Sequence, residues 1–307
     1  MNQEILSKNP KKFLAMTGYT VQEFEALSLY FTVLFEEKMK TGTLSGKPRK
    51  KRKYTPYKKS PLPTAADNML FILIYLKSGT IQEVHASLFG MHQSDANKRI
   101  HFLHPLLYAA LKAAGESPAR NADSSNIGSG GKFFLHDGTE RPVVRPKNKE
   151  AQLLFYSGKK KQHSLKNILL MNELCRIIFL SDTCEGKKHD KKAADEAGYG
   201  EHFPEGSILL QDTGFQGFTA GNAAILQPKK KPKGGELTAE EKENNKAISK
   251  IRIRIEHVIS SVKRYRILKD EIRNWKNGFR DEVMETCCGL HNFRLRFRPW
   301  TPVAVWN

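Results

Sequence analysis

Hydrophobic residues recur at helical spacing near both ends of the chain, whereas short apolar runs typical of strands occupy its middle. Two capping boxes, Thr80 with Glu83 and Thr238 with Glu241, mark predicted helix starts, and Thr20 or Thr17 can start the first long helix. The predicted helices lie within 1–40 and at 64–77, 80–89, 95–103, 187–197 and 281–297, and a long helix capped at Thr238 includes the stretch 245–266. The predicted strands are 132–135, 159–171, 176–180, 207–210 and 223–226.

The helix predicted at 245–266 combines a buried stripe with a charged line. Its apolar positions at helical spacing are Ile248, Ile251, Ile255, Val258, Ile259 and Val262. At about 100° per residue, Arg252, Glu256 and Lys263 fall on nearly one line of the helix. Glu256 is a single carboxylate among basic residues that also include Arg264, as expected for a helix that presents a metal ligand to a polyanion. The plainer alternative is a solvent-exposed charged face with ion pairs between residues four positions apart.

The two short helices predicted at 80–89 and 95–103 flank a turn at Gly90 and Met91. Helix, short glycine-containing turn and helix is the outline of a helix-turn-helix DNA-binding motif. His104 and Pro105 are predicted to end the second helix. The side chains expected to reach base edges and phosphates are Gln93, Ser94, Asn97, Lys98 and His101. The alternative is a three-helix packing unit without DNA-binding function, which has similar turn and helix-end residues.

The charge balance favours a polyanionic partner. The 307 residues include 51 Lys and Arg against 32 Asp and Glu, a formal net charge of +19 and a pI near 9.7. Basic residues with aromatics among them indicate nucleic acid rather than a membrane. The Pro- and Gly-containing linker at 44–61 is either a solvated tether or a phosphate-binding segment through Lys50, Lys51 and Arg52.

The four cysteines show no CxxC spacing, so we expect neither a zinc site nor a disulfide framework. No signal peptide opens the chain, and no apolar run approaches the roughly 18 residues that span a bilayer. We therefore expect an intracellular protein, cytoplasmic and associated with the nucleoid, with no membrane partner.

Two aspartates, Asp137 and Asp212, each follow an apolar run and precede a glycine by one or two positions, which leaves room for a bulky ligand. Mg²⁺ is held by few carboxylates plus water and phosphate oxygens, and two such ions support phosphoryl transfer. With Glu256, these acids in a basic chain predict Mg²⁺-dependent chemistry on DNA. Asp182 and Asp190 are rival second ligands, and a loop cap is the alternative for each acid alone.

Several separated motifs resemble the DDE transposases of bacterial insertion sequences, most closely the IS-five group and its Harbinger-like relatives. They are HDGTERP at 136–142, RPKNKEAQLLFYSGKKKQHSLKN at 145–167, LLQDTGFQG at 209–217, IRIRIEHVISSVKRYRIL at 251–268 and HNFRLRF at 291–297. The resemblance implies an α/β RNase H-like catalytic core, a mixed sheet flanked by helices, preceded by an all-α helix-turn-helix domain. It implies that Asp137, Asp212 and Glu256 bind two Mg²⁺ ions, for which Mn²⁺ can substitute, and that Arg252 and Lys263 contact DNA.

Further basic residues near these motifs are candidate DNA contacts. They are Arg141 and Arg145 after the first aspartate, Lys159, Lys160 and Lys161 before the next strand, and Arg264 after Lys263. A turn stabilised by local ion pairs is the alternative around Arg141. The expected organisation is a helical segment at 1–43 that could dimerise, a basic linker at 44–62, a helix-turn-helix domain at 63–120, a linker at 121–131 and a catalytic domain at 132–307.

The leading hypothesis is a transposase that binds the inverted-repeat ends of its element, cleaves the phosphodiester there and joins the 3′-hydroxyl ends to target DNA. Double-stranded DNA is then the partner, and a homodimer or larger assembly holds two ends together. The alternatives are a domesticated DNA-binding protein that does not cut and a stand-alone metal-dependent endonuclease. Retention of all three acids argues against the first alternative, and a separate recognition domain argues against the second.

Overall fold

The computed structural model describes the chain except for residues 51–53, 56–59, 129–130, 275, 277 and 304–307. The chain divides into two compact units. The first contains residues 1–117, 263–270 and 274–297, and the second contains residues 118–262, 271–273 and 298–307. In the described residues, no helix is both long and apolar enough to cross a membrane.

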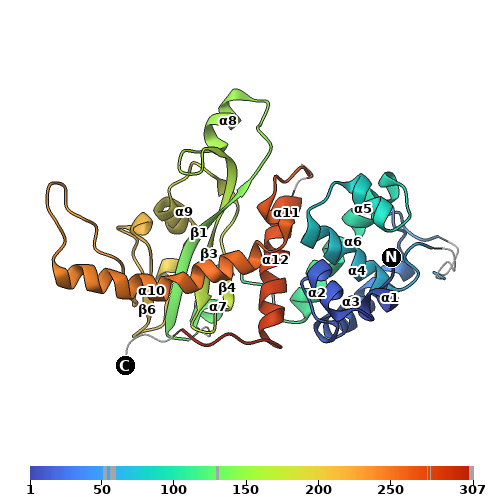
Figure 1. Cartoon of the computed structure of the whole chain (residues 1–307), viewed down its shortest axis with the longest axis horizontal. Helices are drawn as coiled ribbons and strands as arrows, with labels where there is room; N and C mark the ends of the chain where they lie inside the picture. Colours follow the sequence, from blue (N-terminus) through green and yellow to red (C-terminus); the bar gives the residue numbers. More distant parts are fainter. Residues whose placement is uncertain (51–53, 56–59, 129–130, 275, 277, 304–307) are drawn as a thin grey trace. The chain divides into compact units, whose positions relative to one another are not determined.

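The described elements of the first unit are all helical (Figure 1). They are α1 (Gln3–Ser7), α2 (Pro10–Thr17), α3 (Val21–Thr41), α4 (Ala65–Ser78), α5 (Gln82–Leu88), α6 (Gln93–Ala113), α11 (Arg266–Lys269) and α12 (Phe279–Leu295). Helix α4 is apolar on every side, and its residues from Met69 to Leu76 are buried, as expected for a central helix. Helix α12 packs against α6, so the last long helix joins the core of this unit.

Local signals explain where several of these helices begin or end. Thr20 accepts a hydrogen bond from the Glu23 backbone, and the Glu23 carboxylate accepts one from the Thr20 backbone, which completes the predicted cap of α3. Pro10 starts α2, and Gly18, in the left-handed conformation, ends it. Gly79 ends α4 in the same way, with φ of 62°.

Two local predictions in this unit are wrong. Helix α5 begins after Ile81, and Thr80 does not cap it, because no side-chain bond is made at that helix start. Helix α6 does not end at His104 but runs through Pro105 to Ala113. Proline there removes one backbone hydrogen bond, and the burial of Leu103, Leu106 and Leu107 on either side offsets that loss.

The second unit is a mixed sheet with helices packed on it (Figure 1). The strands are β1 (Phe133–Pro142), β2 (Tyr156–Ser157), β3 (Gln162–Asn172), β4 (Ile177–Leu180), β5 (Cys184–Glu185), β6 (Ile208–Leu210) and β7 (Ala224–Leu226). Their order is β2-β3-β1-β6-β7, and β4 and β5 also pair with β3. Strand β1 is antiparallel to β3 and parallel to β6, which is parallel to β7.

The helices of this unit are α7 (Ser124–Gly128), α8 (Lys149–Phe155), α9 (Asp190–Ala197) and α10 (Ala239–Val262), with 3-10 turns at Tyr199–His202 and Thr213–Phe215. Residues alternate between the two faces of the sheet. Phe134 and Leu209 pack against α9 on one face, whereas Leu135 and Leu210 belong to the other. Helix α10 packs against β1. This curled sheet flanked by helices confirms the predicted RNase H-like class of core.

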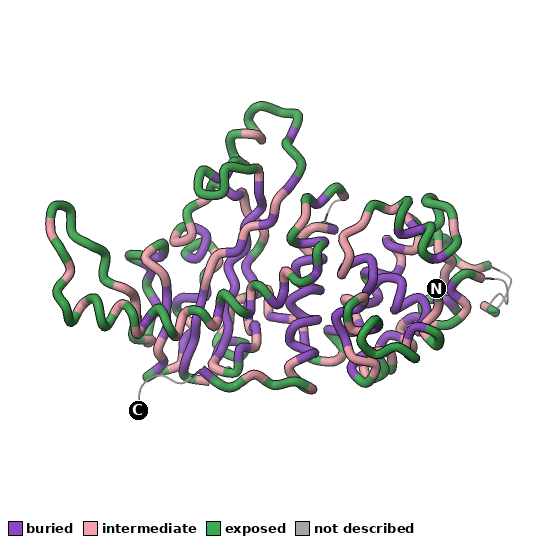
Figure 2. The backbone as a smooth tube through the Cα atoms, viewed as in Figure 1, coloured by how far each residue is buried: buried purple, intermediate pink, exposed green. Residues whose placement is uncertain are grey.

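Three features of the second unit differ from the sequence predictions. Strand β1 does not stop before Asp137 but continues to Pro142, because it pairs with β3 along its length. Helix α10 ends at Val262 rather than near Arg266. The Gly- and Ser-rich segment expected as a linker includes α7, whose Ile127 is fully buried in the core of this unit. Figure 2 shows that buried residues follow the strands of the sheet.

Candidate active site

The pairing of β1 with β6 brings Asp137 and Asp212 side by side. The two strands are parallel, with Leu135 opposite Leu210. Asp137 comes two residues after Leu135, and Asp212 comes two residues after Leu210. Neighbouring strands lie about 4.8 Å apart, so the two carboxyl groups leave the sheet close together. The Asp137 carboxylate accepts a hydrogen bond from the Gly138 backbone at 2.8 Å, and that of Asp212 accepts one from Thr213 at 2.7 Å.

The environment of Asp137 disfavours a bare negative charge. The pKa of its carboxyl is raised to about 6, mainly by burial and further by the nearby carboxylates of Asp190 and Asp212, although Arg252 and the hydrogen bond from the Gly138 backbone lower it in part. Clustered acids of this kind repel one another, and a bound cation relieves the repulsion. Asp137 and Asp212 therefore have the donor chemistry of a hard divalent ion site.

Asp190, the rival ligand considered from the sequence, also lies at this place. Its carboxylate accepts a bond from the Lys166 ammonium at 2.7 Å. A Cβ atom added at Gly138 would lie 2.8 Å from one Asp190 oxygen, and one added at Gly214 would lie 3.3 Å from the other. The space beside Gly138 that we expected to admit a ligand is therefore filled by Asp190 itself.

Sequence reasoning missed Lys166, although a signal was available. This lysine interrupts an apolar strand, and a lysine is seldom buried without a partner. Its side chain is 7% exposed, bonds Asp190 and the Lys188 carbonyl, and lies 3.9 Å from Glu140. The pair holds a positive charge beside the aspartates and fixes the start of α9 against β3.

Helix α10 brings Arg252 to the same site. Its guanidinium lies 3.2 Å from the Asp212 carboxylate, with the arginine side chain 13% exposed. Glu256 follows one helical turn later with an exposed side chain, and it is not among the groups that shift the pKa of Asp137. Lys263 and Arg264 come after the end of α10, so the predicted line of charges on one helix stops at Glu256.

Among the residues that the structure describes, no group of three or more His, Cys, Asp and Glu side chains forms a metal cage. Magnesium does not require such a cage, because it is commonly held by one or two carboxylates together with water and substrate phosphates. Two adjacent aspartates, one of them paired with Arg252, fit that mode of binding.

The first unit contains the predicted helix-turn-helix, with α5 and α6 separated by a turn at Gly90. The amide of Gln82 on α5 accepts bonds from Gln93 at 2.6 Å and Asn97 at 3.0 Å on α6. These bonds fix the start of α6 relative to α5. Gln93, Ser94 and Lys98 are exposed, while Asn97 and His101 are half-buried.

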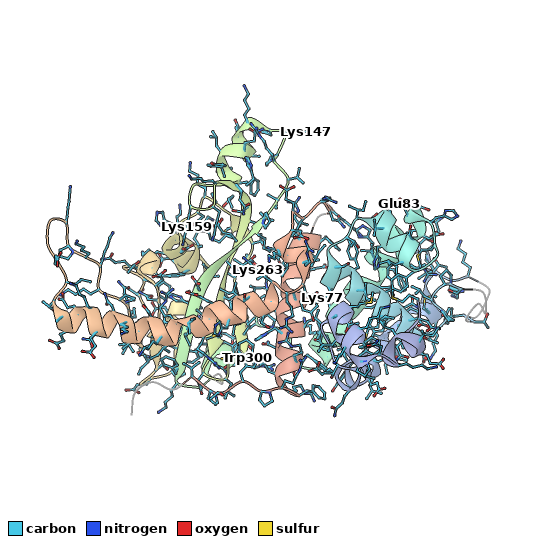
Figure 3. All side chains as sticks on the ribbon, viewed as in Figure 1. Lys77, Glu83, Lys147, Lys159, Lys263 and Trp300 are labelled. Carbon is cyan, nitrogen blue, oxygen red and sulfur yellow. The ribbon has the colours of Figure 1, made fainter. Side chains whose placement is uncertain are left out.

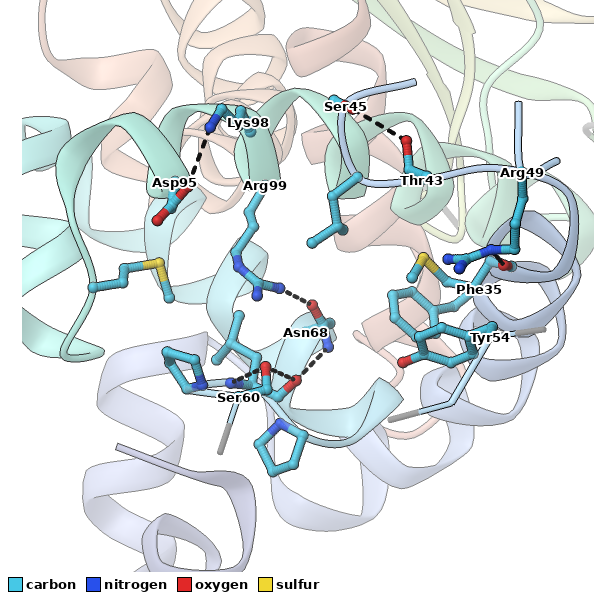
Figure 4. A pocket seen from close by; sticks show the side chains of 16 residues that line it. Phe35, Thr43, Ser45, Arg49, Tyr54, Ser60, Asn68, Asp95, Lys98 and Arg99 are labelled. Atoms are coloured by element: carbon cyan, nitrogen blue, oxygen red, sulfur yellow. Dashed lines mark hydrogen bonds and ion pairs between the residues drawn. The ribbon is translucent and has the colours of Figure 1, made fainter. Parts of the chain in front are cut away.

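A cavity of about 430 Å³ lies beside this motif, between α6, the end of α3 and the segment after it (Figure 4). Lys98 at its edge lies 3.3 Å from Asp95, and Arg99 bonds the Asn68 side chain at 3.1 Å. Both cations therefore already have partners within the unit.

Two family models match the chain. The model of the DDE superfamily endonuclease matches residues 136–292, more than half of the chain. The chain belongs to the DDE endonuclease superfamily. The model of the helix-turn-helix of DDE superfamily endonucleases matches residues 60–113, which confirms the predicted DNA-binding motif. Members of the superfamily generally use divalent metal ions.

A probable transposase for insertion sequence element IS702 from Microchaete diplosiphon is 32% identical to the endonuclease over 168 residues. The match covers 54% of this chain and 58% of that relative. The endonuclease thus aligns with less than two thirds of the relative's length. No solved structure matches this chain.

The endonuclease places its predicted DNA-contacting residues in different environments. Arg145, Lys159, Lys160 and Lys161 are exposed on the connection between β1 and β3, and Lys50 is exposed in the first unit. Lys51 and Arg52 lie outside the described residues.

Arg141 and His101 instead contact their own protein. Arg141 is fully buried, and its guanidinium bonds the side chains of Asn167 at 2.6 Å and Thr183 at 2.9 Å. In this structure it links β1 to β3 and to the segment after β4, and no part of it reaches the surface. The His101 ring packs edge-on against Phe279, with centroids 5.6 Å apart.

Proposed function

We propose that this DDE endonuclease is a transposase that binds the inverted-repeat ends of its insertion sequence, cleaves the phosphodiester there and joins the exposed 3′-hydroxyls to target DNA. The adjacency of Asp137 and Asp212 at neighbouring parallel strands is the observation that supports it most. Two such carboxylates beside a basic helix can hold divalent ions against a DNA phosphate. The similarity to a probable transposase supports the same reaction.

In this proposal Asp137, Asp212 and Glu256 hold two Mg²⁺ ions, or Mn²⁺ in their place. When bound, such ions activate a water or a 3′-hydroxyl and stabilise the leaving oxygen. The chain's own residues do the positioning: Lys166 keeps Asp190 in place, and Arg252 holds the Asp212 carboxylate. Arg252, Lys263 and Arg264 would contact the phosphates of the bound DNA.

Recognition is assigned to the helix-turn-helix, with Gln93, Ser94, Asn97 and Lys98 reading the transposon end. The expected domain boundaries, including a catalytic domain from residue 132, remain part of the proposal. So does a homodimer or larger assembly on DNA, because two ends must be joined in one reaction. Association with the nucleoid follows if the partner is chromosomal DNA.

The test is nicking of a supercoiled plasmid that contains the DNA flanking this chain's coding sequence, with Mg²⁺ or Mn²⁺. Asp137→Asn and Asp212→Asn should each lower the nicking rate at least 100-fold and change the DNA dissociation constant less than three-fold. The matched control is Asp182→Asn, because the Asp182 side chain is almost fully exposed and its carboxylate pairs with Arg120.

Nicking that survives in Asp137→Asn and disappears in Asp182→Asn would refute the assignment of the acids. Specific binding of the flanking DNA by the wild-type chain, with no cutting by either ion, would favour the non-cutting DNA-binding protein. Cutting of any plasmid at similar rates, with no joining of 3′ ends, would favour a stand-alone endonuclease.

A further inference from the structure

The connection between β1 and β3, residues 143–161, is called the arm. It contains α8 and β2 and projects from the sheet of the second unit (Figure 1). Helix α8 has no buried residue, and two of its leucines, Leu153 and Leu154, are 69% and 50% exposed. A short helix normally buries its apolar side chains. In α8 they are exposed, which indicates a partner that covers them.

Polar contacts, rather than an apolar core, hold α8 in place. Asn148 caps its first turn by accepting bonds from the backbone of Glu150 at 2.7 Å and Ala151 at 3.2 Å. The Gln152 side chain donates to the Pro146 carbonyl at 2.7 Å and accepts from Arg145 at 2.8 Å. The helix is therefore positioned while its leucines stay free for another molecule.

The charge of the arm identifies that molecule as an anion. Residues 145–161 contain the six basic side chains Arg145, Lys147, Lys149, Lys159, Lys160 and Lys161 and the single acid Glu150. All six basic residues are exposed, and Lys147 and Lys159 are labelled in Figure 3. A second copy of the chain meeting the arm through a two-fold axis would place these charges against their own kind. Phosphates neutralise them instead.

The arm also extends from the strand that contains Asp137. Pro142, where β1 ends, lies five residue steps after Asp137, which is about 17 Å at roughly 3.3 Å per residue. DNA held at the aspartates can therefore continue along the arm. Apolar wedges on basic surfaces are a known device for unstacking bases and bending DNA.

We propose that α8 is a DNA wedge: the lysines of the arm bind the phosphates of double-stranded DNA, and Leu153 and Leu154 insert between adjacent base pairs and unstack them. This inference rests on the proposed action on DNA, but it concerns distortion of the duplex rather than cutting. A duplex that is already distorted then binds more tightly, because the unstacking cost has been removed.

The test compares two 30-base-pair duplexes of the same sequence, one fully paired and one with two adjacent mismatches, by fluorescence anisotropy without a divalent ion. A 2-aminopurine beside the central step reports unstacking. The full-length wild-type chain should bind the mismatched duplex at least five-fold more tightly and raise the fluorescence of both. In Leu153→Ala/Leu154→Ala the preference should fall below two-fold and the fluorescence rise should disappear on the paired duplex.

Two control variants separate the contributions of charge and shape. Leu29→Ala/Val33→Ala removes equally exposed apolar side chains from α3 and should keep the preference. Lys159→Ala/Lys160→Ala should weaken binding of both duplexes by a similar factor. Both leucines of α8 are exposed, so their replacement leaves the fold intact.

The proposal is overturned if the wild-type chain shows no preference, or if Leu153→Ala/Leu154→Ala retains it. A change of oligomeric state in that variant, measured by light scattering, would assign the leucines to a second copy and would also overturn it. Because no cutting is measured, a chain that prefers distorted DNA but never nicks it supports the wedge and refutes the transposase.

Discussion

Single side chains of this protein derive their properties from neighbours that are distant in sequence. Asp137 has a raised carboxyl pKa because it is buried beside Asp190 and Asp212. His136, the residue before it, faces the opposite side of the sheet, where burial lowers its pKa to about 3 and it bonds Tyr199 and Gln211. His136 therefore stays neutral at physiological pH and acts as a packing and hydrogen-bonding residue.

The raised pKa of Asp137 predicts an effect on stability with a definite sign. Its folded value of about 6 exceeds the unfolded value near 3.9, so its contribution to stability is complete below pH 4 and is lost as the pH rises through 6. Without metal, Asp137→Asn should raise the free energy of unfolding by about 1–3 kcal/mol at pH 7 and by almost nothing at pH 4. Urea unfolding in EDTA measures both values.

Asp182→Asn, at an exposed position, serves as the control and should show no such pH dependence. Added Mg²⁺ should stabilise the wild-type chain and shrink the difference, because an ion that binds only the folded state raises its stability. A difference that is the same at pH 4 and pH 7 would show that the carboxyl is not perturbed.

At the scale of elements, α6 is the helix whose continuity local rules did not predict. Pro105 lies thirteen residues into α6 with its ring exposed, so the helix lacks the hydrogen bond to the His101 carbonyl. The helix persists because Ile100, Leu103 and Leu107 are fully buried along one side. Tertiary packing outweighs a proline that would end an isolated helix.

Pro105→Ala should therefore stabilise the protein, by about 1–2 kcal/mol, since the lost hydrogen bond is restored and only a small entropic advantage of proline disappears. The measurement is the shift of the urea midpoint followed by circular dichroism. Pro10→Ala is a matched control, because Pro10 occupies the first position of α2, where proline is favoured. A midpoint that falls in Pro105→Ala would mean that the ring itself contributes to packing.

At the scale of the whole molecule, the main feature is a large positive charge. A net charge of +19 is distributed over the chain, and described basic segments of both units are exposed. For a DNA-binding endonuclease this charge supplies the part of the affinity that does not depend on sequence. It also predicts that binding weakens steeply with salt.

The expected logarithmic slope of DNA affinity against salt is roughly −5 to −9, for about six to ten neutralised phosphates. Lys159→Ala/Lys160→Ala should reduce its magnitude by about 2, because each lysine is expected to contact one phosphate. Lys11→Ala/Lys12→Ala removes the same charge from the exposed side of α2 and should leave the slope nearly unchanged. Equal reductions in both variants would indicate a general charge effect. Anisotropy titrations between 50 and 200 mM salt measure the slopes.

The sequence by itself determined the local features and the family. The caps at Thr20 and Thr238, the short apolar runs of the strands and the helix-turn-helix outline depend on residues within a few positions of each other. Several short motifs in the right order were enough to indicate a DDE enzyme, because each motif is a run of neighbouring residues.

Only the tertiary structure decided which distant groups meet. Asp137 and Asp212 are neighbours because β1 and β6 pair in parallel, and Lys166 is paired with Asp190 because β3 and α9 pack together. The burial of Arg141 and the survival of α6 beyond Pro105 have the same origin. Each depends on free energy from contacts between segments far apart in the chain, which no local pattern contains.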